Sequence, residues 1–154
     1  MTTASKAYEF EQGTDRVDRA QVHAWLSTEA YWALGRARSV QDAAIDASLN
    51  YGIYRSGTGE QLAYARAVTD GVTFAWVCDV FVSPSARGQG LGKALIAGVT
   101  EDLERLNLKR TLLVTSDAHG LYAQFGFEPL AVPGKWLARE NAAPRSALQS
   151  STSA

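Results

Sequence analysis

The spacing of apolar and polar positions along the chain predicts an alternation of short strands and helices. Residues 8–10 alternate apolar and polar as a strand does, and 18–26 carries apolar residues at helical spacing. A second helix is expected to be capped by Ser39, with Val40 and three alanines on one face, and an apolar strand follows over 49–54. The N-terminal third therefore predicts strand, helix, helix and strand.

Turn-forming clusters divide the middle of the chain into three apolar runs. Residues 56–60 separate the run 51–54 from the run 62–65, and 69–71 separates that one from 74–82. Such spacing is typical of consecutive antiparallel strands. A three-stranded meander is expected here.

The period changes after Pro84. Apolar residues over 91–106 recur at three- and four-residue intervals, which predicts a long amphipathic helix. Residues 111–115 suit a buried strand, 118–125 a short helix and 127–132 a last strand. A strand–helix–strand crossover joined to a meander makes the fold class α+β, with a mixed, mostly antiparallel central sheet flanked by helices.

Length and composition indicate one domain. A chain of 154 residues with 46% hydrophobic residues can bury one core, and we expect the folded domain to span residues 5–138. Residues 139–154 are rich in Ser and Ala, and they carry too little apolar surface to offset the entropy cost of ordering them. That segment is expected to be a disordered tail.

Charge and cysteine content narrow the possible partners and the compartment. The 15 basic and 16 acidic residues nearly balance, so neither nucleic acid nor an anionic membrane is an expected partner. One cysteine, Cys78, and two histidines are a poor ligand set for a metal, and no metal is expected. The N-terminus lacks the apolar core of a signal peptide, which favours a cytoplasmic location.

A glycine cluster at the start of the long helix is the main candidate for a ligand site. Gly88, Gly90 and Gly92 follow an apolar strand, so unhindered backbone N–H groups lie at a helix N-terminus, where an anion is favoured. The P-loop pattern fails because Arg87 and Ala94 stand where Gly and Ser or Thr are needed, and the dinucleotide fingerprint also fails. A strand-to-helix turn that binds nothing remains an alternative.

Two motifs resemble those of the GNAT superfamily of N-acetyltransferases. Arg87-Gly88-Gln89-Gly90-Leu91-Gly92 matches the family's Arg/Gln-x-x-Gly-x-Gly/Ala pattern, and Asp79 to Pro84 looks like the strand that precedes it. Residues 121–129 look like the family's last motif, at family spacing. The sequences of residues 31–36 and 115–122 also resemble those of one bacterial subgroup of the family, whose substrates the resemblance does not identify.

The resemblance implies an acetyl-CoA site with no metal. Backbone of Phe81, Val82 and Ser83 would pair with the pantetheine arm, and an N–H near Val82 would meet the thioester carbonyl. Thr115 and Ser116 stand near the position of the family's pantetheine-binding Asn. The pyrophosphate would meet N–H groups of Arg87, Gly88, Gln89, Gly90, Leu91, Gly92 and Lys93.

Three residues are candidates for proton transfer. Tyr122 matches the family tyrosine that protonates the leaving thiolate; otherwise it is a core aromatic. Asp79 is the first candidate base, because burial could raise its pKa, and His119 is the second. Asp79 could instead satisfy a bulge, and His119 could cap a helix. Cys78 is expected to be a buried thiol rather than a nucleophile.

The acceptor cleft is expected from the first helices and their loop, at Glu29, Tyr31, Trp32 and Arg36. Acidic and aromatic residues favour a cationic amine, whereas Arg36 and Arg38 favour an acceptor with a carboxylate, so both remain open. The aromatic residues could equally be core.

The leading hypothesis is an N-acetyltransferase that transfers an acetyl group from acetyl-CoA directly to a primary amine of a small molecule, amino acid or peptide N-terminus. The alternatives are a non-catalytic acyl-CoA-binding regulatory or interaction module, and an interaction domain without ligand. A homodimer is possible through Phe127, Leu130 and Val132, since many proteins of this fold pair through their C-terminal strands.

Overall fold

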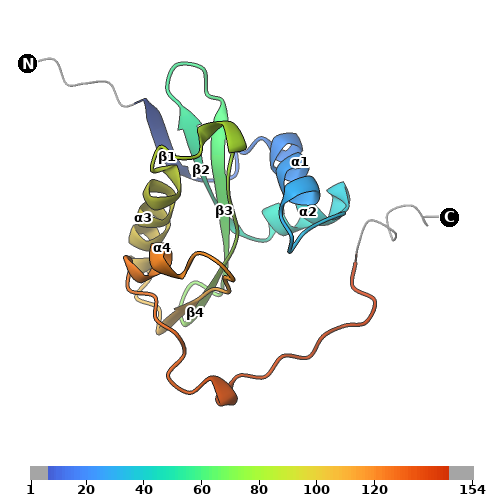
Figure 1. Cartoon of the computed structure of the whole chain (residues 1–154), viewed down its shortest axis with the longest axis vertical. Helices are drawn as coiled ribbons and strands as arrows, with labels where there is room; N and C mark the ends of the chain where they lie inside the picture. Colours follow the sequence, from blue (N-terminus) through green and yellow to red (C-terminus); the bar gives the residue numbers. More distant parts are fainter. Residues whose placement is uncertain (1–6, 146–154) are drawn as a thin grey trace, which may run out of the picture.

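The computed structural model describes residues 7–145, which form a five-stranded sheet with helices on both faces (Figure 1). Strands β1 to β4 are antiparallel neighbours, and β5 runs parallel to β4. The predicted meander and the mixed, mostly antiparallel sheet are therefore confirmed. In spatial order the strands are β1 (Tyr8–Gln12), β2 (Leu49–Arg55), β3 (Gln61–Thr69), β4 (Phe74–Val82) and β5 (Arg110–Leu112).

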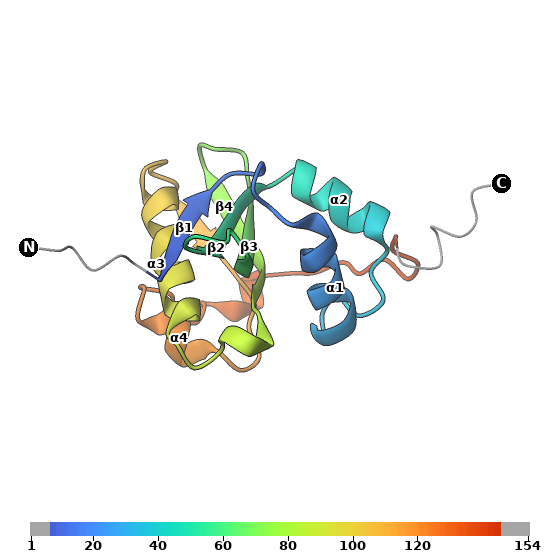
Figure 2. The ribbon, with the colours of Figure 1, turned by 90° about the horizontal axis from the view of Figure 1, so that it is seen from above.

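The helices divide between the two faces of the sheet (Figure 2). α1 (Arg19–Glu29) and α2 (Arg38–Asp46) lie together on one face. The crossover helix α3 (Leu91–Glu104) covers the other face and connects β4 to β5, with α4 (His119–Ala123) beside it. Two short 3-10 turns, η1 (Pro84–Ala86) and η2 (Pro133–Lys135), complete the described elements.

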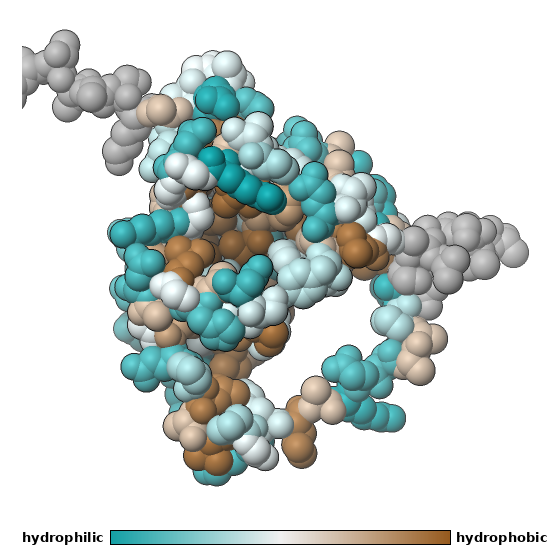
Figure 3. Space-filling model, in the orientation of Figure 1, coloured by the Kyte–Doolittle hydropathy of each residue, from teal (hydrophilic) through white to brown (hydrophobic). Residues whose placement is uncertain are grey.

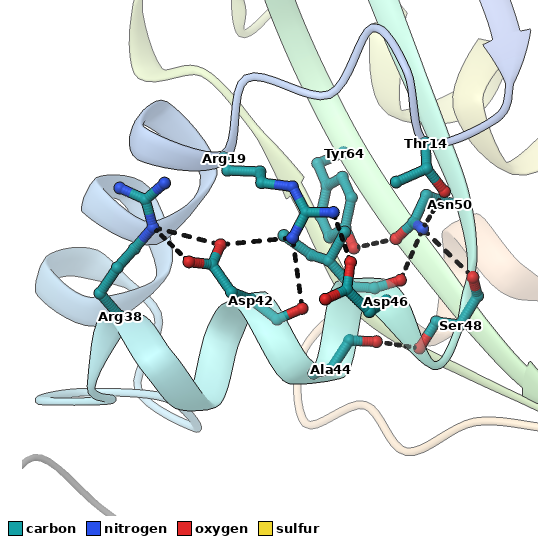
Figure 4. Close-up of polar contacts among 10 residues, drawn as sticks. Thr14, Arg19, Arg38, Asp42, Ala44, Asp46, Ser48, Asn50 and Tyr64 are labelled. Carbon is teal, nitrogen blue, oxygen red and sulfur yellow. Dashed lines mark hydrogen bonds and ion pairs between the residues drawn. The ribbon is translucent and has the colours of Figure 1, made fainter. Parts of the chain in front are cut away.

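Alternation along β3 creates a separate core on each face. Ala63, Ala65 and Ala67 are fully buried under α3, where their small side chains let the helix approach the sheet closely. Tyr64 points the other way and packs with Trp25 and the rest of the α1–α2 core. Its hydroxyl donates to Asn50 Oδ1 at 2.6 Å (Figure 4). The sheet is thus buried on both sides and forms a rigid platform.

The predicted cap and buried face of α2 are wrong. The helix begins after Ala37 without a side-chain cap, and its buried residues are Gln41 and Ile45. Asp42 instead accepts from Arg38 and Arg19 at the surface (Figure 4). Packing against α1 and the sheet decides which face is buried, and this outweighs the apolar pattern of a short alanine-rich segment.

A bulge interrupts β4 at Asp79. The β3–β4 register shifts here, because Arg66 faces Cys78 but Tyr64 faces Phe81. The extra residue lets Asp79 adopt a left-handed backbone with φ of 53°, which is uncommon for a residue other than glycine. Such a conformation persists only where surrounding contacts hold it. The pairing of β4 with β5 ends at Trp76, before the bulge.

The predicted last strand, Phe127–Val132, is wrong, since no strand is assigned there. Pro129 has no N–H to donate to a ladder, and the neighbouring strand β5 is only three residues long instead of the expected five. The first residue of this segment, Phe127, packs edge to face on Tyr122 at 5.8 Å. The remaining residues of this segment, 128–132, do not join the sheet.

The chain from residue 128 to residue 145 runs away from the body as an exposed segment (Figure 1). Figure 3 shows open space between part of this segment and the body. Residues 139–145 of the predicted tail contain no helix or strand, and 146–154 lie outside the described residues. Within 7–145, no helix has both the length and the apolar character needed to cross a membrane.

Candidate active site

A cleft opens where β4 and β5 diverge. The two parallel strands pair only from Phe74 to Trp76 on the β4 side, so the edge of β4 from Val77 to Val82 has no strand partner. A cavity of about 520 Å³ occupies this gap. Unpaired backbone N–H and C=O groups at its wall can accept an extended polar chain as an added strand.

The N-terminus of α3 lies at one end of this cleft. Gly90 is the N-cap residue with φ of 76°, and no side chain caps the helix. The first N–H groups of α3 therefore have no partner within the helix and meet the positive end of the helix dipole. Gly92 lines the cleft, and a Cβ there would lie 3.8 Å from Val82 Cγ2 and 3.9 Å from Leu121 Cδ2. A Cβ would therefore make only ordinary contacts here, whereas a longer side chain would extend between β4 and α4.

Residues of the glycine cluster differ in their exposure. Leu91 is buried under the sheet, whereas Gly88 and Gly90 have positive φ angles that favour glycine. Arg87 is exposed, donates to Val82 O at 3.2 Å and lies over the Phe81 ring. Of the six motif residues only Gly92 lines the cleft, so the motif brings backbone and no side chain to the lining.

Tyr122 is mostly buried and lines the cleft from α4. Burial raises the pKa of its phenol, and the negative charge of Asp117 raises it further. The phenol therefore keeps its proton at neutral pH. A protonated hydroxyl facing a cleft can donate to a developing anion.

Asp79 lies in the same cleft but is fully engaged. Its Oδ2 accepts from Arg36 Nη1 at 2.8 Å and Arg66 Nε at 2.7 Å, and its Oδ1 accepts from Trp32 Nε1 at 2.9 Å. Burial alone would raise the pKa of Asp79, but the two guanidinium groups hold it below its ordinary value. The expected upward shift is therefore wrong, and this carboxylate is a weak base.

The contacts of Asp79 fix the acceptor end of the cleft. Trp32 and Arg36 come from the loop between α1 and α2, and Arg66 comes from β3. All three line the cleft with Asp79. The network extends through Arg36 to the buried Gln41, whose Oε1 accepts at 2.9 Å. One carboxylate at a bulge thus joins a loop, a strand and a helix.

Tyr31 and Ser116 connect the two sides of the cleft mouth. Their hydroxyl oxygens lie 2.8 Å apart, although the residues are 85 positions apart in sequence. Tyr31 also packs edge to face on Trp32, with ring centroids 5.0 Å apart. Thr115 lines the cleft, and its hydroxyl accepts from the N–H of Ala118 at the start of α4.

Ten expected site residues lie outside the cleft lining, namely Glu29, Ser83, Arg87, Gly88, Gln89, Gly90, Leu91, Lys93, Ser116 and His119. Glu29 is at the end of α1 and is 4.0 Å from Arg87. His119 is exposed at the first position of α4, while Tyr122 from the same helix faces the cleft. No group of three His, Cys, Asp or Glu side chains that could hold a metal occurs within residues 7–145.

Several lining residues were missed from the sequence. Arg66, Val68 and Trp76 belong to the meander, which suggested only a structural role. Alternating residues of β3 share one face, so the spacing of Tyr64, Arg66 and Val68 was a usable signal. It could not reveal which neighbour these residues face. The other lining residues missed are Val77, Cys78, Val80, Leu113, Val114, Asp117, Ala118 and Leu121.

Comparisons by family model, by sequence and by structure all identify acetyltransferases as similar proteins. Residues 18–127 match the model of the acetyltransferase (GNAT) family. A crystal structure from Xanthomonas campestris pv. campestris, described as belonging to the GNAT family, is 37% identical with a TM-score of 0.79, covering 93% of this chain and 98% of its own. Serotonin N-acetyltransferase 2 of Oryza sativa subsp. japonica is 38% identical over 82 residues, which are 51% of this chain and 41% of that protein. The chain thus spans less than half of this plant relative.

Proposed function

The chain belongs to the GNAT family of acetyltransferases, and we propose that it transfers an acetyl group from acetyl-CoA to a primary amine by direct transfer in a ternary complex. The observation that carries the proposal is the cleft between the diverging ends of β4 and β5, which has α3's N-terminus at one end and Tyr122 in its wall. The single cysteine supports a reducing cytoplasm as its location.

The residues present fit the donor. Uncapped N–H groups of α3, from Leu91 to Lys93, suit a pyrophosphate. The edge of β4 over Phe81 and Val82 has no strand partner, which suits the amide groups of a pantetheine arm, and Arg87 Nε already donates to Val82 O. Gly92 places no side chain between Val82 and Leu121, which suits an unbranched chain along this wall.

The reaction forms one bond and breaks another. The amine nitrogen bonds to the thioester carbonyl carbon, and the carbon–sulfur bond breaks as the tetrahedral centre collapses. Tyr122 donates its proton to the departing sulfur. The attacking nitrogen loses a proton to water, and water then returns a proton to the phenolate of Tyr122. Asp79 acts as a positioning residue that holds Trp32 and Arg36 in place.

Activity and binding assays test the proposal. Calorimetry with acetyl-CoA measures donor binding, and release of free thiol in the presence of amines measures transfer. Binding with Tyr122-dependent transfer supports the enzyme. Binding without transfer to any amine favours the non-catalytic module, and no binding at millimolar acetyl-CoA rejects both.

We also propose that two chains pair through the C-terminal segment. Leu130, Val132 and Trp136 are at least 37% exposed, and Leu137 is 94% exposed. β5 is one of the two edge strands of the sheet. A cavity of about 720 Å³ lies between the end of α3, β5 and residues 125–136. A second copy, with its own projecting segment, offers apolar surface to cover these side chains.

A further inference from the structure

The acceptor end of the cleft carries more positive than negative charge. Arg36 and Arg66 converge on one oxygen of Asp79, so two guanidinium groups lie side by side with one carboxylate between them. The side chain of Asp79 is 1% exposed, and those of the arginines are 18% and 15% exposed. One positive charge is left without an anion in a place where water screens it poorly.

Part of each guanidinium has no partner among residues 7–145. Arg36 uses only Nη1, which donates to Gln41 and Asp79. Its Nε and Nη2 groups, whose N–H bonds are parallel, donate to nothing in the described chain. Arg66 uses Nε and Nη1, the latter to Ser48 Oγ at 3.2 Å, and its Nη2 is likewise unused. Parallel N–H groups of this kind bind a carboxylate through both of its oxygens.

An apolar wall lies beside these donors. Val68 of β3 and Trp76 of β4 are directly paired in the sheet, and both line the cleft. Trp32 lines it from the opposite side, with its indole N–H held by Asp79 and its ring packed on Tyr31. Two indole rings and a valine suit a flat aromatic or large apolar group.

Other charged residues expected near the acceptor do not change this balance. Glu29 lies outside the cleft lining and beside Arg87. Arg38 lies outside it too, where it binds Asp42 on the surface of α2 (Figure 4). Asp117 also lines the cleft, where its charge acts on Tyr122, and it forms no ion pair with either arginine. Among the acidic residues of 7–145, only Asp79 forms ion pairs with these two arginines, and its charge is already neutralised.

We propose that the acceptor is an amine that also carries a carboxylate and an aromatic or large apolar body, as an aromatic amino acid does. The carboxylate binds Arg36 Nε and Nη2 and Arg66 Nη2, and the body packs against Trp32 and Trp76. The amine then points toward the donor end at Tyr122. This assignment rests on the proposed acetyl transfer, because it concerns the second substrate of the same cleft.

Matched pairs of amines test the assignment without altering the protein. Phenylalanine is compared with 2-phenylethylamine, and 4-(aminomethyl)benzoate with benzylamine. Within each pair only one member carries a carboxylate, and the distance from carboxylate to nitrogen differs between the pairs. Binding is measured by calorimetry on the full chain loaded with CoA, and transfer by thiol release with acetyl-CoA. In at least one pair the carboxylate-bearing member is expected to bind about 10- to 100-fold more tightly.

Variants locate the carboxylate. Arg36→Gln is expected to reduce the preference for the carboxylate-bearing amine by about tenfold or more, whereas the matched control Arg38→Gln keeps that preference. If Arg36→Gln does not fold, the double variant Arg36→Gln/Asp79→Asn removes the charge together with its partner. Arg66→Gln is expected to weaken the same preference.

The outcomes separate the two proposals. Equal binding within both pairs, tighter binding of the members without a carboxylate, or no binding of any member at millimolar concentration overturns the carboxylate assignment. A preference that survives both arginine variants overturns it as well. Selective binding without acetyl transfer upholds the carboxylate site and rejects the enzyme. Unselective transfer upholds the enzyme and rejects the carboxylate site.

Discussion

Arg66 Nε lies 2.7 Å from Asp79 Oδ2, so a side chain of β3 holds the one residue of β4 that has a left-handed backbone. This contact joins the bulge to the neighbouring strand. The same carboxylate also holds Trp32 and Arg36 of the acceptor loop. The shape of the cleft therefore depends on a single buried anion.

Replacing that anion is expected to destabilise the fold. Asp79→Asn leaves Arg36 and Arg66 without their counter-charge, which costs about 3–5 kcal/mol for a buried pair. The free energy of unfolding at pH 7, measured by urea titration, checks this value. Asp42→Asn is the control, because its partners are more exposed and its loss costs about 1 kcal/mol or less.

The stability of the wild type depends on pH through the same residue. The arginines lower the folded-state pKa of Asp79 below its unfolded value of 3.8, against the effect of burial. The ion pairs therefore contribute fully above that value, and their contribution is lost as pH falls through the lowered pKa. The difference in free energy of unfolding between the wild type and Asp79→Asn is expected to become smaller below about pH 4. A difference that stays constant down to pH 2 would contradict this assignment.

Tyr122→Phe is expected to lower kcat by about 10²- to 10⁴-fold while the affinity for acetyl-CoA changes little. Burial and Asp117 raise the pKa of the phenol, so wild-type activity is not expected to fall through Tyr122 ionisation below about pH 10. Steady-state kinetics across pH measure both effects. Tyr54→Phe is the control, because Tyr54 lies outside the cleft lining and its hydroxyl has no hydrogen-bond partner within residues 7–145. An unchanged kcat in Tyr122→Phe would exclude this residue as the acid.

Gly92→Leu is expected to abolish acetyl-CoA binding without unfolding the chain. The position is helical and its Cβ has room, but a longer side chain would fill the passage between Val82 and Leu121. Calorimetry measures the loss, and thermal unfolding verifies the fold. Gly92→Ala makes only ordinary contacts and should bind nearly as well as the wild type. Full binding by Gly92→Leu would show that the donor lies elsewhere.

Cys78→Ala is expected to retain activity, although Cys78 lines the cleft. Burial raises the pKa of its thiol to about 11, so the thiol is protonated at neutral pH and direct transfer does not use it. Steady-state rates and intact-mass spectra after acetyl-CoA addition measure this. An acetylated form that is detected in the wild type and is missing from Cys78→Ala would instead indicate an acyl-enzyme route.

A dimer is expected in solution, with about twice the chain mass of 16.6 kDa by light scattering. Val132→Lys places a charge on the C-terminal segment and should shift the protein to a monomer. Val72→Lys is the control, because Val72 is 70% exposed at the turn between β3 and β4. A wild type that remains monomeric at high concentration would refute the pairing.

The elements with the strongest periodic signals were predicted well. β4 has its expected bounds, Phe74–Val82, and α3 begins at the expected Leu91. Both depend on local patterns, namely an unbroken apolar run and a glycine-rich start to an amphipathic helix. The C-terminal strand was wrong because a run of apolar residues is not a strand unless an edge accepts it, and Pro129 interrupts that ladder.

The amino-acid sequence by itself determined the order of the elements, the glycine-rich start of α3 and the family resemblance, because each is written in neighbouring residues. Only the tertiary structure decided that Arg66 and Arg36 meet on Asp79, and that Glu29, Arg38 and His119 lie outside the cleft. Those relations join residues distant in sequence through a bulge and a loop. The pKa of Asp79 illustrates the difference, since burial alone would raise it and only the positions of two arginines reverse the shift.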